Sequence, residues 1–195
     1  MVIGNHSHFA DVGSDVLAVA IPGVAFAASG FLHRDSFRRV VDDSLIILES
    51  MVLNGVLNQI VRHAMQRPRP YMYLNPIPDD KRKNSADDWH SFFSGHTSAA
   101  FAASTAFANI YSVRHPNSKW RPWVWTAAMG AASLMAFFRP ASGEHFYSDA
   151  LVGAAVGFAA GTAVPALHHN RARKAGASAA SFNFSGSHAS FSLRF

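Results

Sequence analysis

The stretch SGHTSAAFAASTAFANIYSV, residues 94–113, indicates a helical protein. Alanine, the best helix former, recurs through it, and the stretch lacks the strict apolar–polar alternation of a β-strand. Ser94 can accept a hydrogen bond from the first turn as an N-cap, so the helix is expected to begin beside Gly95 and His96. A glycine and a histidine therefore lie at a helix start, where backbone N–H groups point outward.

Four more apolar stretches flank this one, at residues 16–32, 44–61, 123–138 and 150–167. They too lack strand-like alternation, and alanine is frequent in all of them except 44–61. A chain of 195 residues is large enough for one domain with a real core. We therefore predict an all-α bundle of about five to six helices, with the functional site between helices.

The C-terminal residues have a different pattern, so we divide the chain into a helical domain at 1–175 and a tail at 176–195. Residues 181–184 and 189–195 alternate apolar with polar side chains, and Gly186 with Ser187 offers a turn. This period of two predicts a short β-hairpin. A disordered tail is the alternative. The charged segment 71–90 is expected to be a long loop, of the kind that often forms a lid or binding loop.

Membrane insertion is the main question left open by composition. The apolar stretches are near the minimum length for a bilayer span, and small residues are frequent in all of them except 44–61. The second stretch includes Asn54, Asn58 and Gln59, and the mean hydropathy of the chain is only +0.07. These features favour a soluble or peripheral bundle, with an integral membrane protein as the alternative.

Charge and cysteine content narrow the possible partners. The formal charge of +5 favours anionic partners such as phosphates or anionic lipid surfaces. The absence of cysteine excludes disulfides, a thiol nucleophile and thiolate metal ligands. Zinc-finger spacing and an aromatic-rich basic sheet motif are missing, so nucleic acid is not an expected partner. The oligomeric state stays open.

The motif Arg139-x5-His145-x3-Asp149 carries the strongest chemical signal. We expect Ser142 to cap the helix that follows, which places His145 and Asp149 four residues apart on one face. The carboxylate would then accept a hydrogen bond from one imidazole nitrogen and leave the other free as a nucleophile. A surface His–Asp pair that only stabilises the helix is the alternative.

Ser94-Gly95-His96 is a candidate anion site. Gly95 lets the backbone approach an anion at the helix start, and His96 would lie at its mouth. A bound phosphate dianion would raise the pKa of His96, which could then protonate a leaving oxygen. The alternative is an ordinary serine cap beside a chance histidine.

The third candidate is Arg62-x6-Arg69-Pro70, at the end of the second apolar stretch. Pro70 holds Arg69 in extended backbone, and Arg67 is a further cation in the same run. Basic residues are also common at helix C-termini because they interact favourably with the helix dipole.

In order and spacing, these motifs resemble the signature of the type 2 phosphatidic acid phosphatase and vanadium haloperoxidase superfamily. That signature reads Lys-x6-Arg-Pro, Pro-Ser-Gly-His and Ser-Arg-x5-His-x3-Asp. This chain has Arg62-x6-Arg69-Pro70, Phe93-Ser94-Gly95-His96 and Phe138-Arg139-x5-His145-x3-Asp149. The resemblance spans about residues 40–165, with Arg62, Phe93 and Phe138 as departures.

The resemblance implies an all-α fold and a role for each matched residue. His145 would attack phosphorus and form a phosphohistidine, Asp149 would orient it, and His96 would be the general acid. The phosphate oxygens would be held by Arg62, Arg69, Arg139, Ser94 and the Gly95 amide. Phosphatases of this type need no metal, so no cofactor and no metal site are expected.

We therefore predict an acid-phosphatase-like phosphoric monoester hydrolase, with a lipid phosphate or diphosphate as substrate and a soluble monoester as second choice. The bacterial cell envelope, periplasmic or peripheral to a membrane, is the expected location. A vanadate-dependent haloperoxidase is one alternative. The other is a non-catalytic envelope assembly protein that retains the fold.

Overall fold

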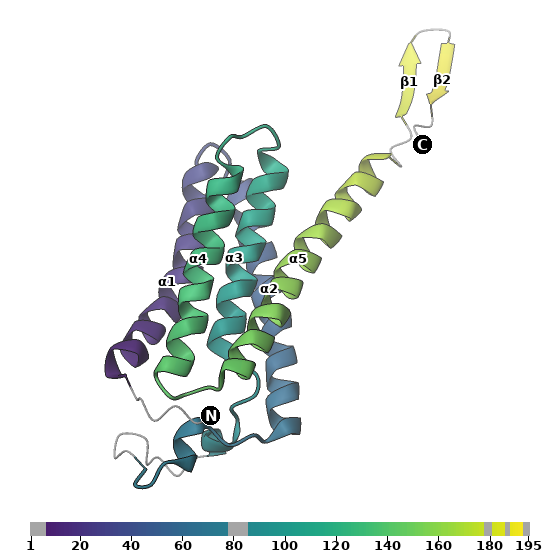
Figure 1. The fold of residues 1–195 in the computed structure, drawn as a ribbon. Coiled ribbons are helices and arrows are strands. Elements are labelled where there is room, and N and C mark those ends of the chain that lie inside the picture. Colours follow the sequence, from purple (N-terminus) through teal and green to yellow (C-terminus); the bar gives the residue numbers. More distant parts are fainter. Residues whose placement is uncertain (1–6, 78–85, 178–180, 186–187, 193–195) are drawn as a thin grey trace.

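The computed structural model describes residues 7–77, 86–177, 181–185 and 188–192. Within these residues the chain folds into a bundle of five long helices, which confirms the predicted all-α class (Figure 1). The helices are α1 (His8–Leu32), α2 (Phe37–Met65), α3 (Gly95–Arg114), α4 (Arg121–Ala141) and α5 (Tyr147–Ala177). Two short 3-10 helices, η1 (Pro70–Tyr73) and η3 (Ala86–Trp89), lie in the long loop between α2 and α3.

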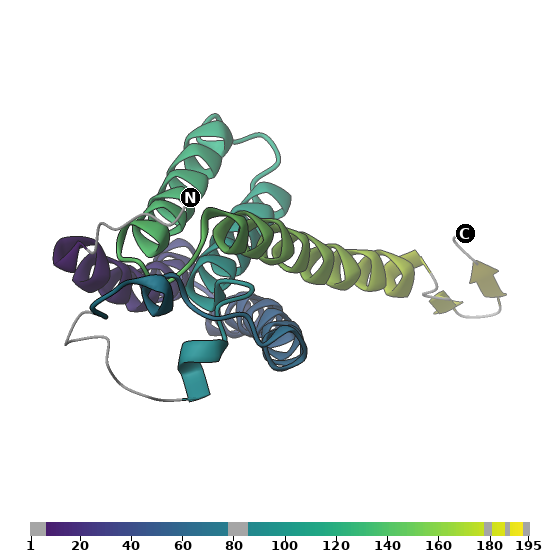
Figure 2. The same cartoon turned by 60° about the horizontal axis from the view of Figure 1, so that its bottom comes forward.

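Helix α3 lies at the centre of the bundle and contacts each of the other four long helices (Figures 1 and 2). Nearly all of its buried side chains are alanine, serine or threonine. Small side chains let helix backbones approach closely. The Ala-rich sequence of this segment therefore produces a narrow central helix on which the other four pack.

Three glycines on α5 make the closest of these contacts. Gly153, Gly157 and Gly161 are spaced four residues apart and face α3. A Cβ atom at Gly157 would lie 2.1 Å from the Ser98 carbonyl oxygen, and one at Gly161 would lie 2.5 Å from that of Ala102. Because only glycine fits, this row sets the separation of α3 and α5 and holds their N-terminal ends together.

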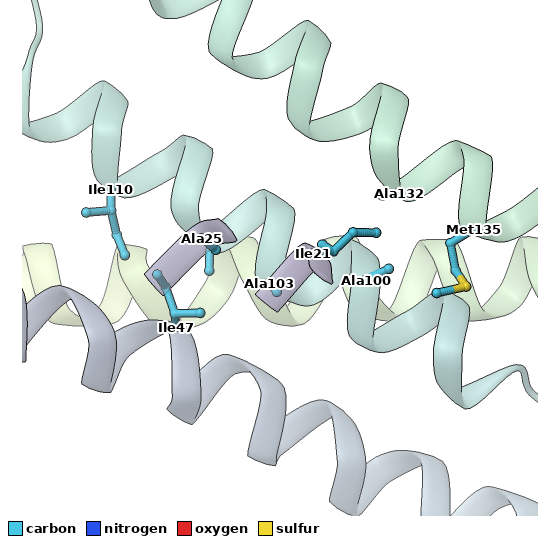
Figure 3. Packing of buried hydrophobic residues seen from close by; sticks show 9 residues of the cluster. Ile21, Ala25, Ile47, Ala100, Ala103, Ile110, Ala132 and Met135 are labelled. Carbon is cyan, nitrogen blue, oxygen red and sulfur yellow. The ribbon is translucent and has the colours of Figure 1, made fainter. Parts of the chain in front are cut away.

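The apolar core is small and built from short side chains (Figure 3). Ile21 of α1, Ile47 of α2 and Met135 of α4 are its larger members around the alanines of α3. Many large apolar side chains instead face outward, among them Val19 at 77% and Phe31 at 74% exposure. A surface this apolar is unusual for a soluble protein.

Helix α2 explains the apolar surface and corrects the expectation of a soluble or peripheral bundle. Asn54 and Asn58 face the interior at 2% and 6% exposure, whereas Val52, Val56 and Ile60 face outward. Two of the three polar residues that counted against membrane insertion, Asn54 and Asn58, are therefore sheltered by protein, whereas Gln59 is exposed. An average over the whole helix hides this reversed arrangement, since it does not distinguish one face from the other.

Three helical segments are long and apolar enough to cross a membrane: His8–Leu32, Phe37–Tyr73 and Tyr147–Arg171. Together with the outward-facing apolar side chains, they favour the integral alternative over the peripheral one. A polar interior with an apolar exterior is what a bilayer requires of a helix bundle.

The C-terminal segment matches the predicted hairpin. Strands β1 (Ser181–Ser185) and β2 (His188–Ser192) pair antiparallel, with Phe182 opposite Phe191. They follow α5, which continues to Ala177 rather than ending near residue 167 (Figure 1). The predicted turn at residues 186–187 lies outside the described residues, as does segment 78–85 of the loop expected to act as a lid.

Candidate active site

The three sequence motifs meet at one end of the bundle, where α2 and α4 end and α3 and α5 begin (Figure 1). A cavity of about 330 Å³ opens there. Its lining residues are Ala18, Asn58, Arg62, Arg69, Asp87, His90, Phe93, Gly95, His96, Ala99 and His145. One member of every motif therefore faces the same space.

His145 is buried at 4% exposure, with Nδ1 2.7 Å from the Ser91 carbonyl oxygen. The nearest Asp149 oxygen is 3.8 Å from Nδ1, too far for a hydrogen bond. The predicted His145–Asp149 pair is thus present as a close i,i+4 contact, while the short hydrogen bond of Nδ1 is the one to Ser91. The carbonyl can only accept, so Nδ1 carries the proton and donates it to Ser91, which leaves Nε2 unprotonated as a nucleophile requires.

Burial lowers the pKa of His145 to about 4, and the nearby Arg139 and Arg69 guanidiniums act in the same direction against the Asp149 carboxylate, which raises it. The imidazole is therefore neutral at neutral pH. A neutral ring is the form that can attack phosphorus.

The turn before α5 differs from the expected one. Ser142 does not cap α5: its N–H donates to the Phe138 carbonyl at 2.9 Å, and it ends α4. Gly143 follows with φ of 75°, a conformation that glycine adopts readily. Asp149 itself accepts from the Phe146 N–H at 3.0 Å, at the helix start. His145 thus lies in the turn that precedes α5 and is held from outside the helix.

Two guanidiniums, those of Arg62 and Arg69, line the cavity, and two carboxylates link them to each other and to Arg139. The Asp87 carboxylate bridges Arg62 and Arg69, and the Glu144 carboxylate forms an ion pair with Arg69. Glu144 also lies 3.6 Å from Arg139. The motif spacing predicted the arginines but not these two acids. Their only sequence signals were position: Asp87 lies in the charged loop, and Glu144 precedes His145.

Two arginine nitrogens at this site have no partner. The Nε atoms of Arg62 and Arg139 are buried without a hydrogen-bond acceptor. Arg139 is held by Ser14 of α1, whose hydroxyl accepts from Nη1 at 3.0 Å. Buried donors are nearly always satisfied in folded proteins, so these two N–H groups are exceptions among the described residues.

The start of α3 is formed as predicted, with one difference. Ser94 accepts from the Thr97 N–H at 3.4 Å and donates to the Thr97 hydroxyl at 3.0 Å. Its side chain is fully buried and is not among the cavity-lining residues, and its role in binding phosphate stays a prediction. Gly95 and His96 do line the cavity. Burial, aided by Arg139, His145 and Arg69, lowers the pKa of His96 to about 4.

The departures from the family signature have structural partners. The Phe93 carbonyl accepts from Asn58 Nδ2 at 2.7 Å, and a Cβ atom at Gly95 would lie 3.0 Å from the Asn58 Oδ1 atom. Asn58 thus supports the loop, and a larger residue at 95 would crowd its side chain. Phe138 packs its ring against α1, where a Cβ atom at Gly13 would lie 2.9 Å from it.

No group of three or more His, Asp or Glu side chains that could hold a metal ion is found among the described residues.

Comparison with known proteins fits this geometry. The model of the PAP2 superfamily matches residues 43–173, which is more than half of the chain. The chain belongs to the PAP2 superfamily. The match confirms the resemblance that the motifs indicated and includes every cavity-lining residue except Ala18 of α1.

Other PAP2 proteins share sequence or fold with it. Lipid A 1-phosphatase of Porphyromonas gingivalis is 32% identical over 111 residues, covering 57% of this chain and 22% of that protein. The chain thus spans about a fifth of the length of this curated relative.

Two solved structures have the same fold. The transmembrane PAP2-type phosphatidylglycerolphosphate phosphatase of Bacillus subtilis has a TM-score of 0.62 at 21% identity, covering 87% of this chain and 81% of that one. Aquifex aeolicus LpxE has a TM-score of 0.55 at 25% identity, covering 82% and 87%.

Proposed function

We propose that this PAP2 protein is a metal-independent phosphatase that hydrolyses lipid phosphate monoesters or diphosphates through a phosphohistidine at His145. One observation carries the proposal. The neutral His145 ring donates a hydrogen bond from Nδ1 to the Ser91 carbonyl. The ring lies beside a cavity that is lined by Arg62 and Arg69, and Arg139 is near the ring. A nucleophile and a phosphate-binding set are then side by side.

The reaction follows from these positions. A substrate phosphate takes the guanidinium contacts now made by Asp87 and Glu144, and Nε2 of His145 attacks phosphorus as the ester P–O bond breaks. The three guanidiniums and the Gly95 N–H stabilise the charge that develops on the phosphoryl oxygens. His96, protonated once the dianion has raised its pKa, gives its proton to the leaving oxygen. Water then attacks phosphorus, with His96 as base, and releases phosphate and neutral His145.

A lipid substrate is supported by the surroundings of the site. The cavity lies at one end of a bundle whose exterior is apolar and whose helices α1, α2 and α5 are long enough to span a membrane. A phosphorylated headgroup at a membrane surface would reach it without leaving the bilayer. The names of the similar proteins, two of which describe phosphatases of lipids, favour the same class. We place the site on the periplasmic side of a bacterial envelope.

Phosphate release in detergent with EDTA tests the proposal. The panel includes a diacylglycerol phosphate, a lipid diphosphate, lipid A and p-nitrophenyl phosphate. We expect turnover of a lipid substrate by the wild type and none by His145→Ala. His168→Ala is the control, because that histidine pairs with Glu49 and does not line the site cavity.

Other outcomes would redirect the assignment. Halide oxidation with vanadate and peroxide, without phosphate release, would identify a haloperoxidase. Equal phosphate release by wild type and His145→Ala would refute the nucleophile. If the protein showed neither activity, the remaining alternative would be a non-catalytic envelope assembly protein that retains the fold.

A further inference from the structure

The buried Asp149 carboxylate accepts from three donors at 3.0 Å or less, and Nδ1 of His145 lies farther from it, at 3.8 Å. Oδ1 accepts from Arg67 Nη1 at 2.5 Å. Oδ2 accepts from the Ser91 hydroxyl at 2.5 Å and from the Phe146 N–H at 3.0 Å. The carboxylate, at 0% exposure, is therefore neutralised by a guanidinium rather than by an imidazolium.

Arg67 is fixed in this position from several sides. Its guanidinium carbon lies 4.1 Å from the centre of the Phe146 ring, and Nη1 also donates to the Ser148 hydroxyl at 3.0 Å. Its main-chain carbonyl accepts from the Ser91 N–H at 2.9 Å. A planar guanidinium can stack and form directed bonds at once, which a lysine cannot do.

Ser91 connects this pair to the imidazole. Its hydroxyl donates to Asp149, and its carbonyl accepts from Nδ1 of His145 at 2.7 Å. The serine is completely buried, so neither group exchanges its partner for water. A displacement of Asp149 would move the Ser91 carbonyl and with it the ring.

We propose that Arg67 is a positioning residue for His145: it neutralises Asp149 and, through Asp149 and the Ser91 carbonyl, holds the imidazole in place. The inference rests on the proposed function and names a residue that the motif signature leaves unassigned.

The charges around His145 give this arrangement a measurable consequence. Arg69, Arg139 and His96 face the ring and disfavour its protonation, whereas Asp149, 3.8 Å away, favours it. Arg67 offsets the field of that carboxylate. Its loss would expose the imidazole to an uncompensated negative charge and raise the pKa of His145.

A double-mutant cycle tests the inference through Arg67→Gln, Asp149→Asn and the pair together. We expect Arg67→Gln to lower kcat/KM at neutral pH about 10- to 100-fold, because the ring shifts, and to move the acid limb of the pH profile up by about one unit. The double variant restores charge balance and keeps the hydrogen bonds, so it should recover at least about tenfold over Arg67→Gln. Arg38→Gln, an exposed change of the same charge on α2, should match the wild type.

A double variant as inactive as Asp149→Asn, with the acid limb in its wild-type position, would overturn the inference, because Arg67 would then have no effect on the ring through Asp149. An Arg67→Gln variant with a lower melting temperature and an unmoved pH limb would reduce Arg67 to a structural role and overturn it too. An NMR titration of protein labelled with ¹⁵N-histidine measures the pKa of His145 directly and does not depend on turnover. The His145 signal is assigned by its absence from the spectrum of His145→Ala. If the wild type hydrolyses no phosphate ester, the proposed function fails while the NMR titration still decides this inference.

Discussion

At the scale of single residues, the site depends on two histidines that are both neutral at rest. Burial lowers the pKa of His145 and that of His96 to about 4. His145 must stay neutral to attack, whereas His96 must gain a proton once phosphate is bound. The first requirement fails as pH falls through about 4, and the second fails at high pH.

The pH–rate profile should therefore be bell-shaped, with an acid limb of kcat/KM near pH 4. His96→Ala should remove the basic limb and slow an alkyl phosphate more than p-nitrophenyl phosphate, because only the poor leaving group needs the proton. Steady-state rates with both substrates between pH 3 and 10 check this. An unchanged ratio of the two rates would contradict the role of His96.

Arg139 offers a second test at this scale, since its Nε has no partner. Vanadate, an analogue of the phosphoryl group, should raise the melting temperature of the wild type by binding the native state selectively. The shift should be much smaller in Arg139→Ala. Arg121→Ala, at the other end of the same helix, is the control and should keep the full shift. Equal increases in melting temperature for Arg139→Ala and the wild type would contradict the assignment of Arg139 to anion binding.

At the scale of elements, the contact of α3 with α5 fixes the distance between the segments that hold His96 and His145. The Ser94 N–H donates to the Asp149 carbonyl at 3.1 Å, just below the row of glycines that begins at Gly153. The geometry of the site thus depends on glycines that do not touch it.

Gly157→Ala should consequently destabilise the protein by about 1–3 kcal/mol, because the new Cβ atom would overlap the Ser98 carbonyl and push the helices apart. Gly130→Ala on α4 is the matched control. No atom lies within 4 Å of its added Cβ, and alanine favours the helix by about 0.5–1 kcal/mol. Melting in detergent and turnover of a soluble ester report on both. If Gly157→Ala equalled Gly130→Ala, close packing would not set the helix separation.

At the scale of the whole molecule, the bundle has a polar interior and an apolar exterior. Its two ends are both ionic. The end opposite the site holds Asp43, which accepts from Arg114 Nε at 2.7 Å and lies 3.1 Å from His33 Nε2. This cluster joins the ends of α1 and α3 to the start of α2. Between the two ends, large apolar side chains of α1 and α2 face outward.

The protein should therefore stay in the membrane fraction after carbonate and after high-salt washes, and only detergent should release it. Val52→Glu, on the exposed face of α2, should impair insertion, since a charge at the centre of a span costs about 2.5–3.5 kcal/mol. Val113→Glu, exposed near the end of α3, is the comparison and should cost less. Release of the wild type by either wash would contradict the integral assignment.

Local sequence alone determined the helices, the capping of α3 by Ser94 and the family signature. Each can be read from short stretches of sequence. The helices follow from alanine content, the cap from a serine three residues before its donor, and the signature from fixed spacing within each motif. The C-terminal hairpin follows from the same kind of local alternation. These features were predictable because no distant segment has to be placed before they form.

Only the tertiary structure decided how His145 is held and which way the helices face. Ser91 lies 54 residues before His145, and Arg67 lies 82 residues before Asp149. Which of several acceptors a buried donor reaches is set by packing, so the i+4 spacing did not reveal the Ser91 carbonyl as the acceptor of the short bond. The face of α2 that packs inward buries Asn54 against Ser98 and Asn58 against the Phe93 carbonyl, and leaves the apolar side chains outside. Composition could not indicate this, because it counts side chains without regard to the face on which they lie.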